Sequence, residues 1–243
     1  MLPAPVFVPQ KTAKAAAQWA VRHDLVDFAD YTGINPEVAN AWNRSLFDHV
    51  TEFPELRKGL AFAGSAQAHV KRYVEAQRAA FVKRAVERGV STEAAEKWAL
   101  AHLKPPRIAG KTYAQSIPPP FSPGVSVNVK FGKNPSVFQE LLARDVRVGW
   151  HPVGCDTIRS VVDHELGHQL DELLGLSVDS AVKTLYTEVV GKGVKNAVSE
   201  YAGKSIQEFV AECWAEFLNN PSPRPTASAV GEIIRKRYEA KFR

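Results

Sequence analysis

Two histidines and a glutamate form the segment of this sequence that is best suited to chemistry. His164, Glu165 and His168 belong to the run HELGH, an HExxH pattern. On a helix, side chains four residues apart are neighbours, with about 5–6 Å between their Cβ atoms. Two neutral imidazoles at that separation can bind one zinc ion at about 2.0–2.1 Å. The adjacent glutamate can then act as a general base on a zinc-bound water. Composition alone would produce this pattern roughly 0.014 times in a chain of 243 residues.

The residues around the motif predict the helix that this geometry requires. Asp156 is suited to be the N-cap and Gly175 is a typical C-terminal stop, which indicates a helix of about five turns. At about 100° per residue, His164, His168 and Asp171 fall on one stripe. A separate apolar arc comprises Ile158, Val162, Leu166, Leu170 and Leu173. The side chains suited to chemistry are therefore distinct from those that bury the helix.

A catalytic zinc site usually has three protein ligands and one open position, so a third ligand must come from another segment. The strongest candidate is Glu208, in a predicted helix that Ser205 can cap. A structural alternative stays open, because Ser205 and Glu208 fit a capping box and Glu212 and Glu216 could extend a solvated acidic face.

Two features favour a buried role for this acidic strip. It is flanked by the small residues Ala211 and Ala215, which would let another helix approach closely. The opposite arc is apolar and comprises Phe209, Val210, Cys213, Trp214, Phe217 and Leu218. We therefore expect the acidic strip to face the helix of the HExxH motif.

The two segments together resemble a known family. HELGHQLD with SEYAGKSIQEFVAECWAEFL resembles gluzincin-type zinc metallopeptidases, most closely the catalytic domain of anthrax lethal factor and the zincin-like modules of phage head-associated and polymorphic-toxin proteins. In that family a tyrosine precedes the ligand glutamate by seven residues, and the glutamate opens an E-aromatic-x-A-E run. Tyr201 and Glu208 have this spacing, and residues 208–212 read EFVAE. The match covers roughly residues 149–218, less than a third of the chain.

The resemblance implies a zinc-dependent endopeptidase that hydrolyses peptide bonds in a protein or peptide substrate. Under it, the Zn²⁺ ligands are His164, His168 and Glu208. Glu165 would be the general base for a zinc-activated water, and the Tyr201 hydroxyl would stabilise the oxyanion.

The resemblance also implies supporting residues around the metal. Glu212 and Asp171 would orient the ligating imidazoles through hydrogen bonds, as metal sites commonly require. In zincins the edge strand of a sheet binds the extended substrate, and the resemblance suggests residues 125–131 for that role. An interior strand without substrate contact is the alternative.

The helices and strands in the rest of the chain are predicted from the spacing of apolar residues, from capping residues and from prolines. Residues 12–103 are rich in helix formers, with helix starts at Asn35 and at Ser91 or Thr92 and a long basic-faced helix over 69–88. A proline-rich stretch after Leu103 breaks this pattern. We therefore predict a helical region over 1–104 and a zincin-like domain over 105–243. Alternating Val125, Val127, Val129 and Phe131 predict a strand, which gives an α+β, mainly α protein with a small sheet.

The amino-acid composition limits the classes of protein to which this chain can belong. With 45% hydrophobic and 23% charged residues, the chain can bury a core, and a net charge of +5 does not by itself indicate a nucleic-acid partner. No apolar run has the roughly 18 residues of a membrane span, and the N-terminus lacks a signal segment. Cys155 and Cys213 have no CxxC spacing, which favours a reducing compartment and makes them weak ligand candidates. We expect a soluble, cytoplasmic chain without a membrane partner.

Three alternatives remain open at this level. Residues 30–56 resemble segments that precede such domains in phage proteins, which suggests a phage or prophage origin, and a virion-associated protein or one delivered into a host cell. In that setting the chain could be an effector or binding protein whose zinc site is chiefly structural. A nucleic-acid-binding module that uses the basic helices is less favoured. His151, in a predicted loop, could contact substrate or replace a ligand, although loop histidines are more often structural.

Overall fold

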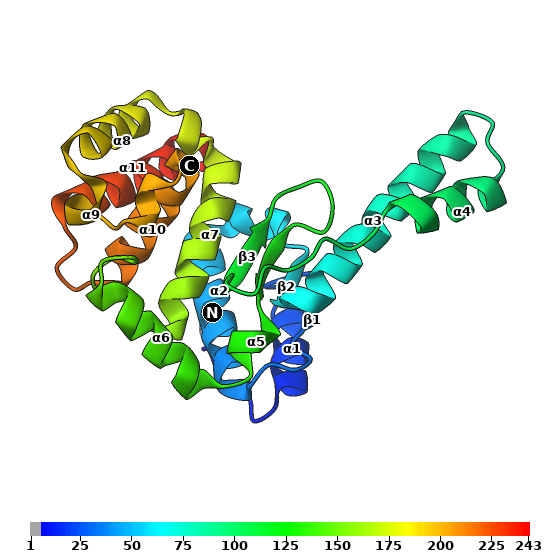
Figure 1. Ribbon diagram of the computed structural model, residues 1–243, viewed down its shortest axis with the longest axis horizontal. Coiled ribbons are helices and arrows are strands. Elements are labelled where there is room, and N and C mark those ends of the chain that lie inside the picture. Colours follow the sequence, from blue (N-terminus) through cyan, green and yellow to red (C-terminus); the bar gives the residue numbers. More distant parts are fainter. Residues whose placement is uncertain (1–5) are drawn as a thin grey trace.

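The computed structural model describes residues 6–243, which form eleven α-helices and one four-stranded sheet (Figure 1). The first five residues belong to the N-terminal stretch predicted to lack a signal segment, and they lie outside the described residues. Helices dominate and the sheet is small and mixed, so the predicted α+β, mainly α class is confirmed. Within residues 6–243, no helix combines the length and apolar character needed to cross a membrane.

The sheet has the strand order β1-β2-β4-β3. β1 (Phe28–Asp30), β2 (Phe62–Ser65) and β4 (Gly124–Val127) run parallel, and β3 (Ala114–Ile117) pairs antiparallel with β4 as an edge strand. The predicted division after residue 104 runs through this sheet, because β1 and β2 precede it while β3 and β4 follow it. One hydrophobic core is built from residues on both sides of that division.

The strand predicted over 125–131 is shorter and differently placed than expected. It ends at Val127, because the side chain of Asn128 accepts a hydrogen bond from the Lys130 amide and caps the short helix α5 (Val129–Gly132). β4 lies between β2 and β3, so the suggestion that this strand forms the substrate-binding edge is wrong. The edge next to the HExxH helix is β3.

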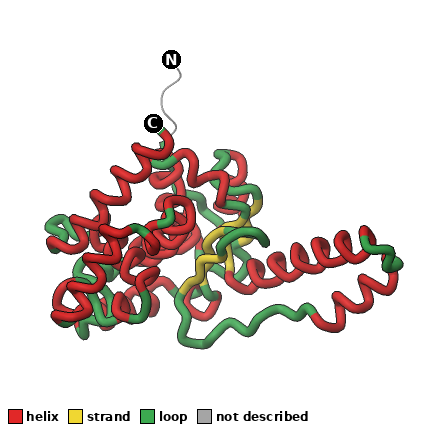
Figure 2. Tube along the Cα trace, turned by 90° about the horizontal axis from the view of Figure 1, so that it is seen from above, coloured by secondary structure: helices red, strands yellow, loops and turns green. Residues whose placement is uncertain are grey.

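The N-terminal helices begin close to the predicted caps. α1 (Ala13–Arg22) precedes α2 (Pro36–Glu52), and α2 is capped by Asn35 as predicted. α3 (Ala66–Glu87) starts three residues before the predicted helix, and α4 (Thr92–His102) is capped by Ser91. α3 and α4 form a helical hairpin that projects from the body of the molecule (Figures 1 and 2).

The C-terminal half surrounds one central helix, α7 (Ile158–Leu174), which carries the HExxH motif. α10 (Ile206–Asn219) lies alongside it and makes its most extensive helix contact (Figure 1). α2 and α6 (Pro135–Arg147) also pack against α7. The other helices of this half are α8 (Ser180–Lys192), α9 (Val194–Ala197) and α11 (Pro225–Phe242). α7 and α10 are thus the two elements that position the candidate site.

Candidate metal centre

The HExxH helix forms as predicted, with its start shifted by one residue. Thr157 rather than Asp156 caps α7, because its side chain accepts a hydrogen bond from the Ser160 amide. Gly175 ends the helix in the left-handed region at φ 70°, a conformation that glycine adopts without strain. The His164 and His168 rings stand on one face with their centroids 4.9 Å apart. The predicted apolar arc is buried at Ile158, Val162, Leu166 and Leu170.

Glu208 lies against both imidazoles. Its Oε2 atom is 3.2 Å from His164 Nε2 and 3.3 Å from His168 Nε2. Ser205 does cap α10 by accepting a hydrogen bond from the Glu208 amide, but the Glu208 carboxylate points to the histidines. The strip that includes Glu212 and Glu216 is not a solvated face, because both of those side chains are buried. The expectation that the acidic strip faces α7 is therefore confirmed.

These three side chains form a group that could hold a metal ion. One ligand atom each from His164, His168 and Glu208 lies within 4.8 Å of the other two. Glu208 Oε2 is buried and receives no hydrogen bond from residues 6–243. A buried carboxylate oxygen without a donor is costly unless a cation neutralises it. Within residues 6–243, no other His, Cys, Asp or Glu joins this group, so His151, Cys155 and Cys213 are not ligands in this geometry.

The electrostatics of the group favour a cation between the ligands. Burial disfavours the charged form of His164, yet Glu208 and Glu212 outweigh it and raise its pKa well above the usual value. Burial likewise opposes ionisation of Glu208, but the two adjacent imidazoles hold its pKa far below the usual range. Binding of a metal ion to these side chains would require His164 to release its proton.

Glu212 contacts the imidazole of His164, the first histidine of the motif. Its Oε1 lies 2.8 Å from His164 Nδ1, on the side of the ring opposite Glu208, and its Oε2 accepts a hydrogen bond of 2.6 Å from Ser199 Oγ. Burial opposes the charge on Glu212, but His151 and His164 outweigh it and lower its pKa to about 2. An anionic partner at Nδ1 leaves Nε2 free to bind a metal. The predicted contact between Glu212 and an imidazole of the HExxH motif is present.

Asp171 has a different partner from the one predicted. Its Oδ1 accepts a hydrogen bond of 2.6 Å from the Ser177 amide, just beyond the end of α7. Among residues 6–243, no hydrogen bond or ion pair joins Asp171 to an imidazole. Asp171 lies on the same helix face as the histidines, as predicted. Its carboxylate, however, accepts its hydrogen bond from the chain beyond Gly175, which folds back on the end of α7. Asp171 therefore stabilises the C-terminal end of α7 and does not orient a ligand.

Glu165 and Tyr201 complete the site. Glu165 is 7% exposed, and burial raises the pKa of its carboxyl despite the neighbouring histidines. The Tyr201 hydroxyl donates a hydrogen bond of 3.2 Å to Glu208 Oε1, and burial together with Glu208 raises the pKa of the phenol. Both side chains line open space beside the metal-binding group, so both can reach a molecule bound there.

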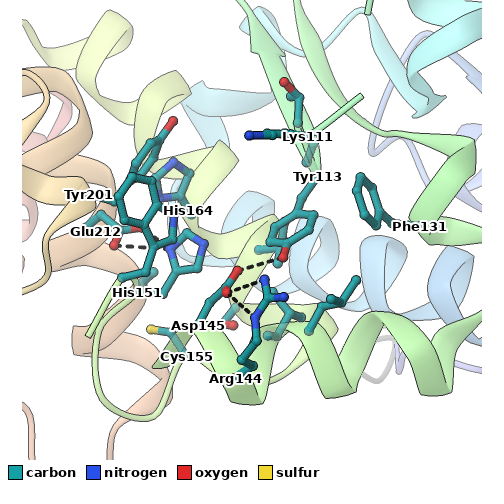
Figure 3. Close-up of a pocket in the computed structure, with 18 of the residues that line it drawn as sticks. Lys111, Tyr113, Phe131, Arg144, Asp145, His151, Cys155, His164, Tyr201 and Glu212 are labelled. Atoms are coloured by element: carbon teal, nitrogen blue, oxygen red, sulfur yellow. Dashed lines mark hydrogen bonds and ion pairs between the residues drawn. The ribbon is translucent and has the colours of Figure 1, made fainter. Parts of the chain in front are cut away.

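Two cavities adjoin the centre, and His164, Glu165 and Tyr201 line both of them. The larger has a volume of about 890 Å³ and lies between the centre and α6 (Figure 3). Its walls are largely apolar and include Phe131, Leu141, Leu142, Val148 and Val161. The smaller, of about 400 Å³, lies between α7, β3 and α10. Ala114 of β3 lines both cavities, so the edge strand passes beside the centre.

Three residues of the site region could not be assigned a role from sequence patterns. His151 lies in the wall of the larger cavity with Nδ1 3.2 Å from Glu212 Oε1, although a loop histidine was expected to be structural. Ser199 is fully buried and holds Glu212. Arg224 forms a bidentate pair with Glu216, at 2.8 and 2.6 Å. Each contact joins segments whose proximity depends on tertiary packing, which spacing cannot reveal. Both cysteines are free and buried.

Comparison with protein-family models, with curated proteins and with solved structures finds no match for this chain.

Proposed function

We propose that this protein is a zinc-dependent endopeptidase of the gluzincin type, with His164, His168 and Glu208 as the zinc ligands. The observation that supports this most strongly is the separation of the ligand atoms. Zinc bonds to nitrogen and oxygen are about 2.0–2.2 Å long, and two such bonds in a tetrahedral arrangement place their ligand atoms about 3.3 Å apart. Glu208 Oε2 stands 3.2 and 3.3 Å from the two Nε2 atoms.

The donor set also supports a catalytic rather than a structural site. Structural zinc sites usually have four protein ligands, whereas catalytic sites have three and leave one position open. The group within residues 6–243 has three members, and a water-accessible cavity adjoins it on two sides. Two imidazoles and one carboxylate are the ligands of established zinc peptidase sites.

Glu165 and Tyr201, which line the cavities beside the three ligands, support a role in peptide hydrolysis. Zinc, when bound, would supply a Lewis acid that polarises a carbonyl group and acidifies water. Glu165, with a pKa raised by burial, would take a proton from the attacking water and later pass it to the leaving amine. Tyr201 would exchange its hydrogen bond to Glu208 for one to the oxyanion, which stabilises the transition state more than the ground state.

The substrate we propose is an extended peptide beside β3. β3 pairs with β4 on one side only, so its other edge can add a strand, and main-chain hydrogen bonds would give affinity. The two cavities lie where side chains on either side of the scissile bond would enter. The centre favours a peptide over a nucleic acid, since carboxylates and aromatic rings surround the two histidines, although Lys111, Lys130 and Arg144 also line the larger cavity.

The second candidate is a phage- or toxin-associated effector or binding protein whose zinc is chiefly structural. The test is Glu165→Gln, which preserves the size of the side chain and removes the base. We expect wild type and variant to bind one zinc per chain, and the variant to cleave a mixed peptide library at least about 100-fold more slowly. Glu188→Gln, at an exposed position on α8, is the matched control and should retain full activity. Equal activity in all three proteins, or none in wild type, would reject the peptidase proposal.

A further inference from the structure

The loop before α7 fixes His151 beside Tyr201. The amides of Trp150 and His151 both donate to the Asp145 carbonyl, at 2.8 and 3.3 Å, and the Tyr201 amide donates to the Trp150 carbonyl at 3.1 Å. The His151 ring centroid is 5.7 Å from that of Tyr201 and 6.2 Å from that of Tyr113. The imidazole therefore lies between two tyrosines that line the larger cavity.

One edge of the His151 ring is anchored. Nδ1 lies 3.2 and 3.4 Å from the two oxygens of Glu212. Because an ionised carboxylate only accepts hydrogen bonds, Nδ1 must carry the proton in this contact. In a neutral imidazole the other nitrogen, Nε2, is then an acceptor. Glu212 thus fixes the orientation of the His151 ring and, in the neutral ring, its tautomer.

The other edge of the ring is available to a ligand. The His151 side chain is 17% exposed and lines the larger cavity together with Tyr201 (Figure 3). Glu165 lines the same cavity. No hydrogen bond from residues 6–243 reaches Nε2. A peptide backbone that enters this cavity leaves water, and each of its amide groups then needs a partner.

We propose that His151 is a substrate-binding residue that acts as a neutral imidazole, with Nδ1 donating to Glu212 and Nε2 accepting a hydrogen bond from one backbone N–H of the peptide in the larger cavity. This inference rests on the proposed peptidase function and names a requirement of the substrate. The peptide must present an unsubstituted amide at the position next to His151, so an ester or N-methyl group there, or a proline, is disfavoured.

Two substitutions separate binding through Nε2 from a role that acts only through Glu212. His151→Asn keeps a donor close to the Nδ1 position and removes Nε2. His151→Gln places an amide group close to Nε2 and removes the donor to Glu212. We expect the Asn variant to bind zinc as wild type does and to lose about fivefold to tenfold in kcat/KM, the size of one neutral hydrogen bond. The Gln variant should bind zinc more weakly and retain the preference for an amide.

The decisive readout is a peptide series in which each amide flanking the scissile bond is replaced in turn by an ester. One position should lower kcat/KM in wild type and have no effect in His151→Asn. Wild-type kcat/KM in the Asn variant, or the same ester sensitivity in both proteins, would overturn this inference and leave the peptidase proposal standing. A wild-type protein that binds zinc and cleaves no peptide would instead reject the peptidase proposal, and this inference with it.

Discussion

Gly167 of α7 and Ala211 of α10 lie so close that a Cβ atom added at Gly167 would stand 2.9 Å from the Cα atom of Ala211. Non-bonded carbon atoms normally pack at about 3.5–4.0 Å, so only a glycine fits at this crossing. Gly167 lies between the two histidines of the motif, and Ala211 lies between Glu208 and Glu212. The absence of a side chain at Gly167 therefore sets the distance between the imidazoles and the carboxylates.

Gly167→Val should separate these helices. A larger side chain would force the backbones apart, and we expect the free energy of unfolding to fall by about 1–3 kcal/mol, the usual cost of overpacking. Zinc affinity should fall as well, because Glu208 would move away from His164 and His168. Urea unfolding and zinc titration would measure both effects. Gly191→Val is the control, since that helical glycine on α8 has no neighbour within 4 Å. Equal effects of the two substitutions would show that the crossing does not position the site.

Tyr201→Phe tests the proposed oxyanion donor. The substitution removes only the hydroxyl that donates to Glu208 Oε1, so zinc stoichiometry should be unchanged. We expect kcat to fall by about 10²–10³, the range found when one donor to an oxyanion is removed. Tyr186→Phe on α8, a ring that packs on Phe209 away from the centre, should have no such effect. An unchanged kcat in Tyr201→Phe would assign this tyrosine to packing alone.

His69 should make the stability of the fold depend on pH. It is fully buried, and burial lowers its pKa to about 4 from the ordinary 6.5. Between these two values the unfolded chain binds a proton that the folded chain does not, so the free energy of unfolding falls as the pH falls. One fully developed charge difference contributes at most about 1.4 kcal/mol per pH unit, or about 2 kcal/mol between pH 6.5 and 5.

Urea unfolding of wild type and His69→Gln at pH 6.5 and 5 would measure this contribution. The variant should be less stable at pH 6.5, because the wild-type ring contacts Ser126 Oγ and the Ser122 carbonyl, each at 2.8 Å. It should also lose less stability on acidification than wild type. Identical losses in the two proteins would mean that another group accounts for the acid sensitivity.

The sequence predicted those parts of the protein that depend on local patterns. The helices of both motifs and their buried faces follow from 3.6-residue periodicity, and Ser205 was predicted as the cap of α10, whereas the cap of α7 is Thr157 and not Asp156. The search for a third ligand pointed to Glu208, which lies against both histidines. The order of strands could not be predicted in this way. β1 and β2 have only three and four residues, and β2 is buried on both faces, so neither shows alternation. Val129 and Phe131 did continue the alternation of β4, but the cap formed by Asn128 turned them into a helix.

The roles of Asp171 and His151 could not be predicted from the spacing of residues in the sequence, because they too depend on contacts with distant segments. A helical stripe gives the direction of a side chain but not the partner that reaches it from another segment. The Ser177 amide donates a hydrogen bond to the Asp171 carboxylate, and the Glu212 carboxylate is the hydrogen-bond partner of His151 Nδ1. Both contacts depend on how loops fold back on α7 and α10, and tertiary packing alone determines that.

The central claim is that two imidazoles and the Glu208 carboxylate bind one zinc ion. Its most direct test is an equilibrium zinc titration, in competition with a chelator, of wild type, Glu208→Ala and the exposed-site control Glu188→Ala. We predict one zinc per chain in wild type and the control, and an affinity at least about 100-fold lower in Glu208→Ala, because that variant loses one of three ligands. Wild-type zinc affinity in Glu208→Ala, or no zinc bound by wild type, would contradict the account.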